Sequence, residues 1–322
     1  MATQATQAGA VVFSSLVQTA LIEQPVWGMF SQETDVAVSR VNGQYPSTIK
    51  MIRLGQATVT DLTSSYPVLG AGAGDTLSRT EISMSIKKAG ISGANSIRIQ
   101  NFEQKLHGMT IQSGLIQTVK ESLMNSILKD ILTRMIRKND EINADYGGEA
   151  LAAGQHVAWA TNGTVAEADI LSARGFLNTQ LVPQNNRYLA YWSDEFKNFM
   201  SDANLKVYFQ YSGGLGQLAS GTLPKVHGFT PYETQSMPYI KPSTGVPTAG
   251  NATFIGATSA NDTRHSLLAW AKEMVGCLIA GVETQITPIP GGAGDSALEV
   301  WAYYYGGVLN KAGVYHKYDA TA

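Results

Sequence analysis

The chain has 322 residues, of which 44% are hydrophobic, so it carries enough apolar material for one large core or two ordinary ones. Only 15% of its residues are charged, against about 25% in an average soluble domain, and the formal net charge is -2. A disordered chain would be less apolar and more charged, and a dedicated nucleic-acid binder would be strongly basic. The composition therefore excludes both classes and indicates a globular protein with few charges.

The single cysteine, Cys277, excludes an intramolecular disulfide framework. Residues 1–10 lack the basic region that opens a secretory signal. The longest strongly apolar run, residues 274–282, is about half the length that spans a bilayer. We therefore expect a soluble protein that has no membrane segment and is made in a reducing cytoplasm.

The N-terminal part combines a short helix with an arm. Residues 11–22 are rich in apolar side chains and predict one amphipathic helix. Residues 23–47 contain two prolines and two glycines, which predict an extended arm. Such an arm has few local ways to bury Trp27 and Phe30, so we expect both side chains to pack on a surface outside the arm.

Two runs of alternating polar and apolar residues follow, at residues 48–54 and 81–87, and they predict two strands. The residues between them, 55–80, are rich in Gly, Ser and Thr and predict the flexible tip of a long hairpin. An isolated two-stranded hairpin is marginally stable in water, so this one also needs partner surfaces.

The strongest local pattern is a long helix. Residues 115–146 contain no Gly or Pro, Ser113 can cap their start, and two glycines follow them. The predicted helix, residues 113–146, is about 48 Å long, and its apolar residues recur at four-residue steps. We interpret it as an amphipathic helix lying across a sheet. Its basic cluster of Arg134, Arg137 and Lys138 is typical of a solvated face.

The remaining elements alternate between helix and strand. Helices are predicted at residues 166–178, from a Ser193 cap to about residue 201, and at 264–279. Strands are predicted at residues 187–192, 226–234, 297–305 and 314–318. Residues 238–251 predict a loop rich in Pro and Gly, and no sequence period indicates a repeat protein.

The sequence offers little chemistry. Its five histidines are scattered singly and have no cysteine partners, so we predict no metal site. The glycine-rich loops lack the spacing of phosphate-binding motifs, so we predict no cofactor. One alternative stays open, an α+β serine hydrolase that uses Ser296 with His265 or His316. Ser296 lacks the context of a nucleophile elbow, so we assign no catalytic residue.

The order of the elements resembles the Hong Kong 97-type major capsid protein of tailed bacteriophages. Residues 48–54 and 81–88 resemble the strands of the family's extended loop, 97–101 and 115–146 its spine helix, 181–189 its helix-to-strand step, 221–232 its Gly-containing segment and 303–309 its closing strand. The resemblance covers nearly the whole chain.

The resemblance implies an α+β fold of the Hong Kong 97 type. Its parts would be an N-terminal arm (1–46), an extended loop formed by a β-hairpin (47–89), a peripheral domain (90–165 plus 295–322) with spine helix 113–146, and an axial domain (166–294).

The implied function is structural and not enzymatic. The subunit would form pentamers and hexamers that close into an icosahedral head around double-stranded DNA, in a virion assembled in the host cytoplasm. The implied partners are other copies of the chain, a separate scaffolding protein, a portal and packaged DNA held nonspecifically, and the resemblance allows for cement proteins. No membrane contact is implied. The low charge count agrees with a surface that neighbouring subunits cover.

The expected inter-subunit contacts lie in the arm and the hairpin. They are Trp27, Phe30, Arg53, Arg79, Glu81, Lys87 and Lys88, and the charged residues among them would form ion pairs. Some family members link a loop lysine covalently to a neighbour. Residues 55–79 contain no lysine, so we expect no such crosslinking. A second shell-forming alternative is an encapsulin-like bacterial nanocompartment that encloses enzymes.

Overall fold

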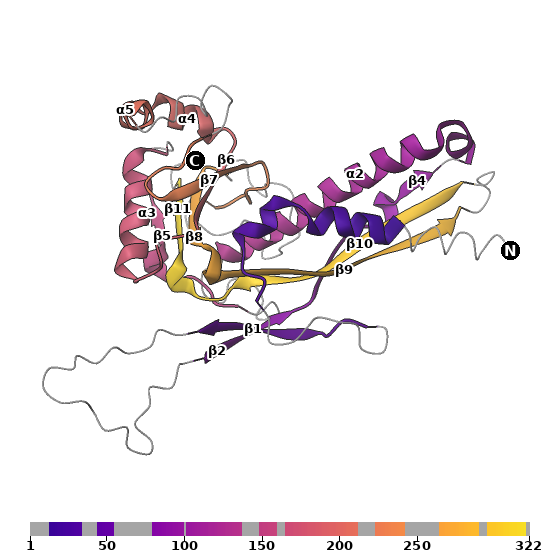
Figure 1. Ribbon diagram of the computed structural model, residues 1–322, viewed down its shortest axis with the longest axis horizontal. Helices are drawn as coiled ribbons and strands as arrows, with labels where there is room; N and C mark the ends of the chain where they lie inside the picture. The colour runs from indigo at the N-terminus through magenta and orange to yellow at the C-terminus, as the bar shows by residue number, and fades with distance from the viewer. Residues whose placement is uncertain are drawn as a thin grey trace, which may run out of the picture.

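The computed structural model describes residues 13–33, 44–54, 79–99, 101–136, 148–159, 165–211, 223–241, 264–289 and 295–319. They form an elongated α+β molecule with two sheets and a projecting hairpin (Figure 1). The strands are β1 (Thr48–Leu54), β2 (Arg79–Ser85), β3 (Lys87–Ile91), β4 (Ile97–Ile99), β5 (His156–Ala158), β6 (Arg187–Trp192), β7 (Phe229–Thr234), β8 (Ser266–Ala271), β9 (Val275–Pro288), β10 (Ser296–Val308) and β11 (Val314–Tyr318). The helices are α2 (Asn101–Met135), α3 (Glu167–Thr179), α4 (Glu195–Ser201) and α5 (Ala203–Tyr211), with 3-10 turns η1 (Pro25–Met29), η2 (Gly93–Asn95), η4 (Ala153–Gln155), η5 (Lys272–Met274) and η6 (Lys311–Gly313).

The first sheet has four strands around β10. The long strand β9 pairs antiparallel with β10 over its whole length, and β3 and β4 pair with different parts of the opposite edge. Helix α2 lies across one face of this sheet, as expected for an amphipathic helix (Figure 1). The predicted rows of apolar residues on α2 are buried there, for example Val119, Leu123 and Ile127.

The bounds of α2 differ from the prediction. The helix begins at Asn101, before the proposed Ser113 cap, and ends at Met135, well before residue 146. The sequence pattern does not indicate its first turns because they contain Gly108 and Gly114, although one glycine weakens a helix by only about 1 kcal/mol relative to alanine. Residues 137–147 lie outside the described part of the chain.

The second sheet has five strands in the order β5-β11-β8-β6-β7. Its edge strands β5 and β7 run parallel to their neighbours, whereas β8 runs antiparallel to both β6 and β11. Helices α3, α4 and α5 gather at the end of the molecule that this sheet occupies (Figure 1). The predicted strand at residues 187–192 is confirmed as β6, and the predicted helix at residues 166–178 is confirmed as α3 within one residue.

The buried turn before β6 depends on one arginine. The side chain of Arg187, which is 2% exposed, donates from Nη2 to the carbonyl of Val182 at 2.6 Å and from Nε to that of Pro183 at 2.9 Å. The backbone at Leu181 and Asn186 has positive φ, of 55° and 56°. The guanidinium thus satisfies carbonyls that the tight turn would otherwise leave buried without donors.

The predicted helix at residues 264–279 is wrong. This segment forms β8, the turn η5 and the first part of β9. Every residue of β8 is buried, because β8 is the middle strand of the five-stranded sheet and has a hydrophobic cluster on each face. Burial on both faces removes the alternation that marks a strand and leaves a continuous apolar run, which also fits a buried helix.

Two strands belong to a different sheet from the one that the predicted domain bounds imply. Strand β9 belongs to the predicted axial segment 166–294, yet it pairs with β10 in the four-stranded sheet. Strand β11 belongs to the predicted peripheral segment 295–322, yet it pairs with β5 and β8 in the five-stranded sheet. The turns η5 and η6, which contact each other, carry the chain between the sheets in both directions.

Candidate assembly surfaces

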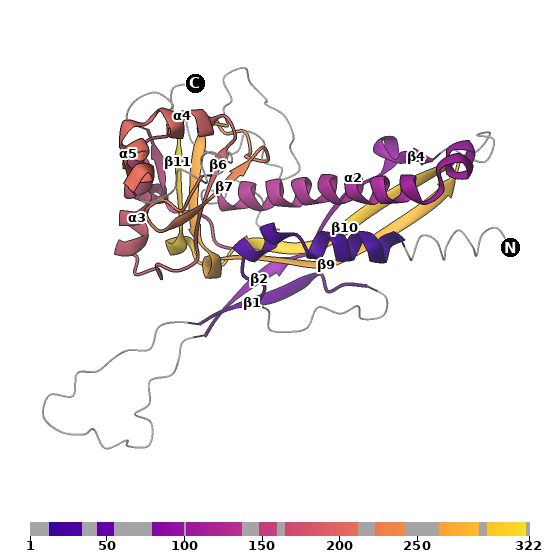
Figure 2. The ribbon, with the colours of Figure 1, turned by 45° about the horizontal axis from the view of Figure 1, so that its top comes forward.

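The hairpin of β1 and β2 leaves the body of the molecule and projects from its underside (Figure 2). Its strands are antiparallel, which confirms the predicted hairpin, and Thr48 pairs with Ser85 at its base. Its apolar residues Ile49, Met51 and Met84 pack on Tyr305 of β10 and on Leu309, which follows β10. The hairpin is therefore anchored at its base to its own subunit.

The predicted charged residues of the hairpin have contacts within the chain. Lys50 Nζ lies 2.7 Å from the Glu81 carboxylate, and these side chains are 57% and 34% exposed. Lys88 Nζ lies 3.9 Å from the centre of the Trp301 ring, on the face of the sheet opposite α2. An exposed ion pair such as Lys50–Glu81 contributes at most about 1 kcal/mol to stability.

The structure shows less of the side-chain contacts of Lys87, Arg53 and Arg79, the other three charged residues predicted to contact neighbours. Lys87 lies in β3, where its backbone pairs with Tyr304 of β10, and its side chain is half-buried. Arg53 of β1 pairs with Thr80, and Arg79 of β2 pairs with Leu54, at the end of the ladder away from its base. Their side chains lie outside the part of the chain that the structure describes.

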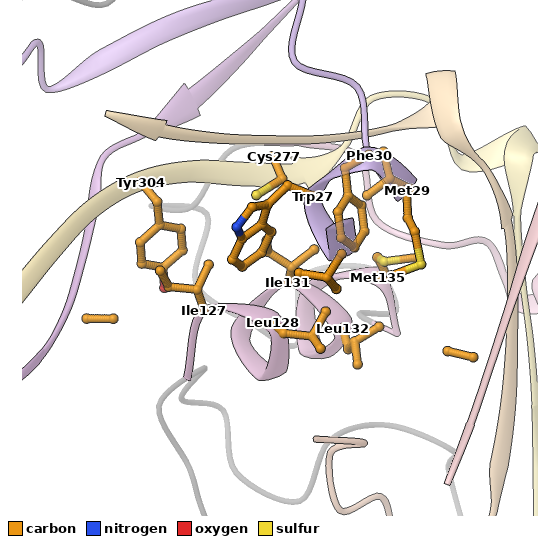
Figure 3. Close-up of a cluster of buried hydrophobic side chains, with 14 of the residues drawn as sticks. Trp27, Met29, Phe30, Ile127, Leu128, Ile131, Leu132, Met135, Cys277 and Tyr304 are labelled. Carbon is orange, nitrogen blue, oxygen red and sulfur yellow. The ribbon is translucent and has the colours of Figure 1, made fainter. Parts of the chain in front are cut away.

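Trp27 and Phe30 pack on a surface outside the arm, as expected, and that surface belongs to their own chain. Figure 3 shows Trp27 between Cys277 of β9 and Ile131 of α2. Its Nε1 donates to the carbonyl of Leu21 at 2.6 Å, and the Phe30 ring stacks on Trp270 of β8 at 5.8 Å. Neither side chain is accessible to a neighbouring subunit in this conformation.

The arm segment reaches this position because it is not fully extended. Pro25 starts η1, a 3-10 turn that aims Trp27 and Met29 inward. Ser31 then pairs with the edge of β9, since its amide donates to Val275 at 2.8 Å and its carbonyl accepts from Cys277 at 2.9 Å. The arm thus fills the space between the sheet and α2.

Four exposed apolar side chains that no sequence pattern indicated lie beside the five-stranded sheet. They lie on or next to helices α3 and α5, and the most exposed are Tyr211 at 88% and Leu181 at 72%. Leu171 and Val207 are also exposed. No sequence pattern distinguishes them, because both helices also carry buried apolar residues and the two faces differ only in what packs on them.

The basic cluster of α2 also needs correction at Arg134, which was expected on a solvated face. Arg134 is 2% exposed, and its Nη2 lies 2.6 Å from the Asp130 carboxylate, one turn earlier. It donates to the carbonyl of Gly306 at 2.5 Å, and the Tyr304 hydroxyl donates to Asp130 at 2.5 Å. This buried network joins α2 to β10, and burial beside Asp130 raises the pKa of Tyr304 well above its usual range. Residues 137–138 lie outside the described part.

The structure does not bring Ser296 together with His265 or His316, as the serine hydrolase alternative requires. Ser296 starts β10 at the end of its sheet far from β11, the strand that carries His316 (Figure 1). His316 contacts His156, and His265 contacts the buried carboxylate of Glu195. Within the described ranges, no group of three His, Cys, Asp or Glu side chains could hold a metal ion. No helix in the described part is long and apolar enough to cross a membrane.

The architecture is similar to that of solved capsid structures. Over 91% of this chain and 88% of the other, it matches the capsid of Ralstonia phage GP4 with a TM-score of 0.58 and 10% identity. It matches the head structure of Helicobacter pylori bacteriophage KHP40 with a TM-score of 0.56 and 12% identity, over 93% and 92% of the chains. The chain has a phage capsid fold.

A third structure with this capsid fold is that of the cyanophage P-SCSP1u capsid. The TM-score is 0.55 and the identity 16%, over 91% of this chain and 87% of the other. No protein-family model and no curated protein matches the sequence. The capsid fold inferred from the order of elements is confirmed by these structures, at identities of 10% to 16%.

Proposed function

We propose that the chain is the major capsid protein of a phage, a structural subunit that assembles with copies of itself into an icosahedral head and catalyses no reaction. The observation that carries this proposal is the capsid fold, which is shared over nine tenths of the chain with structures described as phage capsids or heads. The anchored, projecting hairpin supports it, because a two-stranded hairpin that leaves its own core needs a neighbouring surface.

The proposed subunit is of the Hong Kong 97 type. Its peripheral domain would be the four-stranded sheet with α2, and its axial domain would be the five-stranded sheet with α3, α4 and α5. In this division β9 belongs to the peripheral domain and β11 to the axial domain, the reverse of the division based on the sequence. Residues 1–46 would form the arm and residues 47–89 the extended loop, with Glu81, Lys87 and Lys88 meeting neighbours at the loop's base.

Assembly would proceed through pentamers and hexamers, whose closed rotational symmetry repeats the same contact around each ring. A separate scaffolding protein, a portal and cement proteins are the proposed partners, and the product would be a virion assembled in the host cytoplasm. With a net charge of -2, the chain would hold packaged double-stranded DNA only weakly and nonspecifically.

We expect the exposed apolar side chains beside the five-stranded sheet to contact neighbouring subunits. Replacing Tyr211 and Leu181 by serine should change the free energy of unfolding of the monomer by less than about 0.5 kcal/mol, because both are exposed. The same double variant should lose most of its particle yield in negative-stain electron microscopy, since apolar contacts at the centre of an interface dominate its energy.

The matched control is Lys197→Gln, a substitution at an exposed position of α4, which should leave both the stability and the yield unchanged. Wild-type protein that stays monomeric under all assembly conditions would refute the capsid proposal. A normal particle yield from the double variant would refute only the proposed contact of Tyr211 and Leu181 with neighbouring subunits. Particles that contain host enzymes and no DNA would favour the encapsulin-like alternative.

Covalent crosslinking offers a second test. We expect purified particles, boiled in SDS, to migrate as a single band at the mass of one chain, because residues 55–79 contain no lysine. The lysines near the base of the hairpin are Lys50, Lys87 and Lys88, and Lys50 and Lys88 already contact Glu81 and Trp301. A ladder of bands at multiples of the chain mass would contradict this expectation.

A further inference from the structure

One face of β10 carries three aromatic side chains in a row, those of Trp301, Tyr303 and Tyr305. The residues that alternate with them along the strand, such as Tyr304, are buried in the core that includes α2. The three aromatic side chains therefore lie on the opposite face of the sheet. This is the face on which the projecting hairpin of β1 and β2 is anchored (Figure 2).

The row of aromatic side chains meets both ends of the hairpin. Tyr45, three residues before β1, packs its ring on Tyr303 with 5.2 Å between the ring centres. Lys88, three residues after β2, places its Nζ 3.9 Å from the centre of the Trp301 ring and 5.8 Å from that of Tyr303. The chain that enters the hairpin and the chain that leaves it are thus fastened to neighbouring positions of one strand.

The place that Lys88 occupies is suited to a cation. Trp301 donates from Nε1 to the Glu283 carboxylate at 2.9 Å, and the Tyr303 hydroxyl donates to the same oxygen at 3.1 Å. Donation to a negative charge makes both rings richer in electrons, and the carboxylate itself attracts the ammonium group. Glu283 pairs with Trp301 in the ladder of β9 and β10, so the register of the sheet fixes this arrangement.

Strand β9 leaves room for the end of the chain that enters the hairpin. Gly281 pairs with Tyr303, and a methyl group added at Gly281 would collide with the Tyr45 hydroxyl. A side chain there would push Tyr45 away from Tyr303. The register of β9 and β10 then shifts between Tyr303 and Tyr304, so Trp301 and Tyr303 lie on one side of the irregularity and the base of the hairpin lies on the other.

The hairpin is therefore held at two places. The first is the buried apolar cluster at its base. The second, which we call the aromatic seat, consists of Trp301, Tyr303 and Glu283 and holds Tyr45 and Lys88. A projecting rod that is held at one place can rotate about it, whereas a second place fixes its direction.

We propose that Trp301 and Lys88 are positioning residues that fix the direction in which the hairpin leaves the subunit. The buried cluster keeps the hairpin attached, and the contact of Lys88 with the aromatic seat keeps it from swinging about that attachment. Lys88 is exposed, so the loss of its contact should raise the ratio of displaced to seated hairpins by about two- to fivefold. Only the consequence for assembly rests on the proposed function, since the direction itself belongs to the single subunit.

The distance between two spin labels in the full-length, unassembled protein tests this role. One label replaces Thr80, near the outer end of the ladder of β1 and β2, and the other replaces Ser122, which is exposed on α2. The natural cysteine, Cys277, is buried and should not react with the label. Double electron–electron resonance then gives the distribution of distances between the hairpin and the body.

We expect one narrow peak of distances in the wild type. Lys88→Ser, whose side chain cannot reach the Trp301 ring, should raise the fraction of molecules outside this peak by about two- to fivefold. Lys88→Arg keeps the cation and should retain the wild-type distribution. Lys50→Ser is the matched control, because it removes the same charge from a residue that pairs with Glu81 of the same hairpin, and it should also retain the distribution.

A second variant tests the partner of Lys88. Trp301→Val removes the ring and should broaden the distribution at least as much as Lys88→Ser does. Because both substitutions break one contact, the double variant should be no broader than Trp301→Val alone. If the Trp301 variant does not fold, Lys88→Ser decides alone, since Lys88 is exposed. A broad distribution in the wild type, or one that Lys88→Ser leaves unchanged, would overturn the proposal.

The same proteins separate the positioning role from the capsid function. Under assembly conditions, Lys88→Ser should form fewer closed particles than Lys88→Arg in negative-stain electron microscopy. Wild-type protein that forms no particles, together with a broadened distribution in Lys88→Ser, would refute the capsid function and support the positioning role. Normal wild-type particles, together with an unchanged distribution in Lys88→Ser, would overturn the positioning role alone.

Discussion

Replacing Trp27 by alanine should lower the free energy of unfolding by about 3–5 kcal/mol, one of the largest effects expected of a single substitution here. Trp27 is 2% exposed, and its indole lies between α2 and the sheet of β9 and β10 (Figure 3). Truncation would open a cavity that close-packed neighbours cannot fill and would remove the indole donor to Leu21. Urea denaturation followed by circular dichroism measures the change.

The control for Trp27 is Leu16→Ala in the same N-terminal segment. Leu16 is 50% exposed, so its truncation should cost no more than about 0.5 kcal/mol. Equal losses for the two variants would mean that the arm does not pack on its own subunit in solution. If instead the arm leaves its own subunit on assembly, Trp27→Ala would impair particles far more than it impairs the monomer.

Replacing Arg134 by methionine should destabilise the protein by about 3–5 kcal/mol, because it leaves the carboxylate of Asp130 buried without its cation. The carbonyl of Gly306 also loses its donor. Adding Asp130→Asn to this variant should recover most of the loss, since uncharged groups in the same space carry no comparable desolvation cost. The same denaturation experiment measures all three proteins.

The chain offers a matched control for this pair. Arg98 and Asp295 are joined by the same atoms at the same distance of 2.6 Å, but the Arg98 side chain is 59% exposed. Arg98→Met should cost no more than about 1 kcal/mol. If the two single variants are equally destabilised, burial is not what makes the Arg134 contact matter, and the proposed role of the network in joining α2 to β10 fails.

Both predictions concern contacts that hold the subunit together, and they separate folding from assembly. The arm and the buried ion pair stabilise a single subunit, whereas Tyr211 and Leu181 contribute little to it because they are exposed. Variants of the first kind should change unfolding, and variants of the second kind should change only particle yield. The low charge fraction of the chain agrees with surfaces of the second kind.

The elements that can be predicted from the sequence alone are those whose patterns are local. The strands β1 and β6 were predicted at their observed bounds, and α3 within one residue. In β1 one face packs on the body, which preserves the alternation of polar and apolar residues. In α3 one side is buried and the other exposed, which preserves the helical period. The order of such elements was enough to suggest a capsid fold.

The remaining features depend on contacts between residues that are far apart in the sequence. The sequence of β8 resembles a buried helix because both faces of the strand are buried. Strands β9 and β11 lie in different sheets from those that the predicted domain bounds imply, because strand pairing depends on contacts between residues far apart in the sequence. The burial of Trp27, the pairing of Arg134 with Asp130 and the meeting of His156 with His316 depend on such contacts as well. A local pattern records which sides of an element are covered, but it cannot record what covers them.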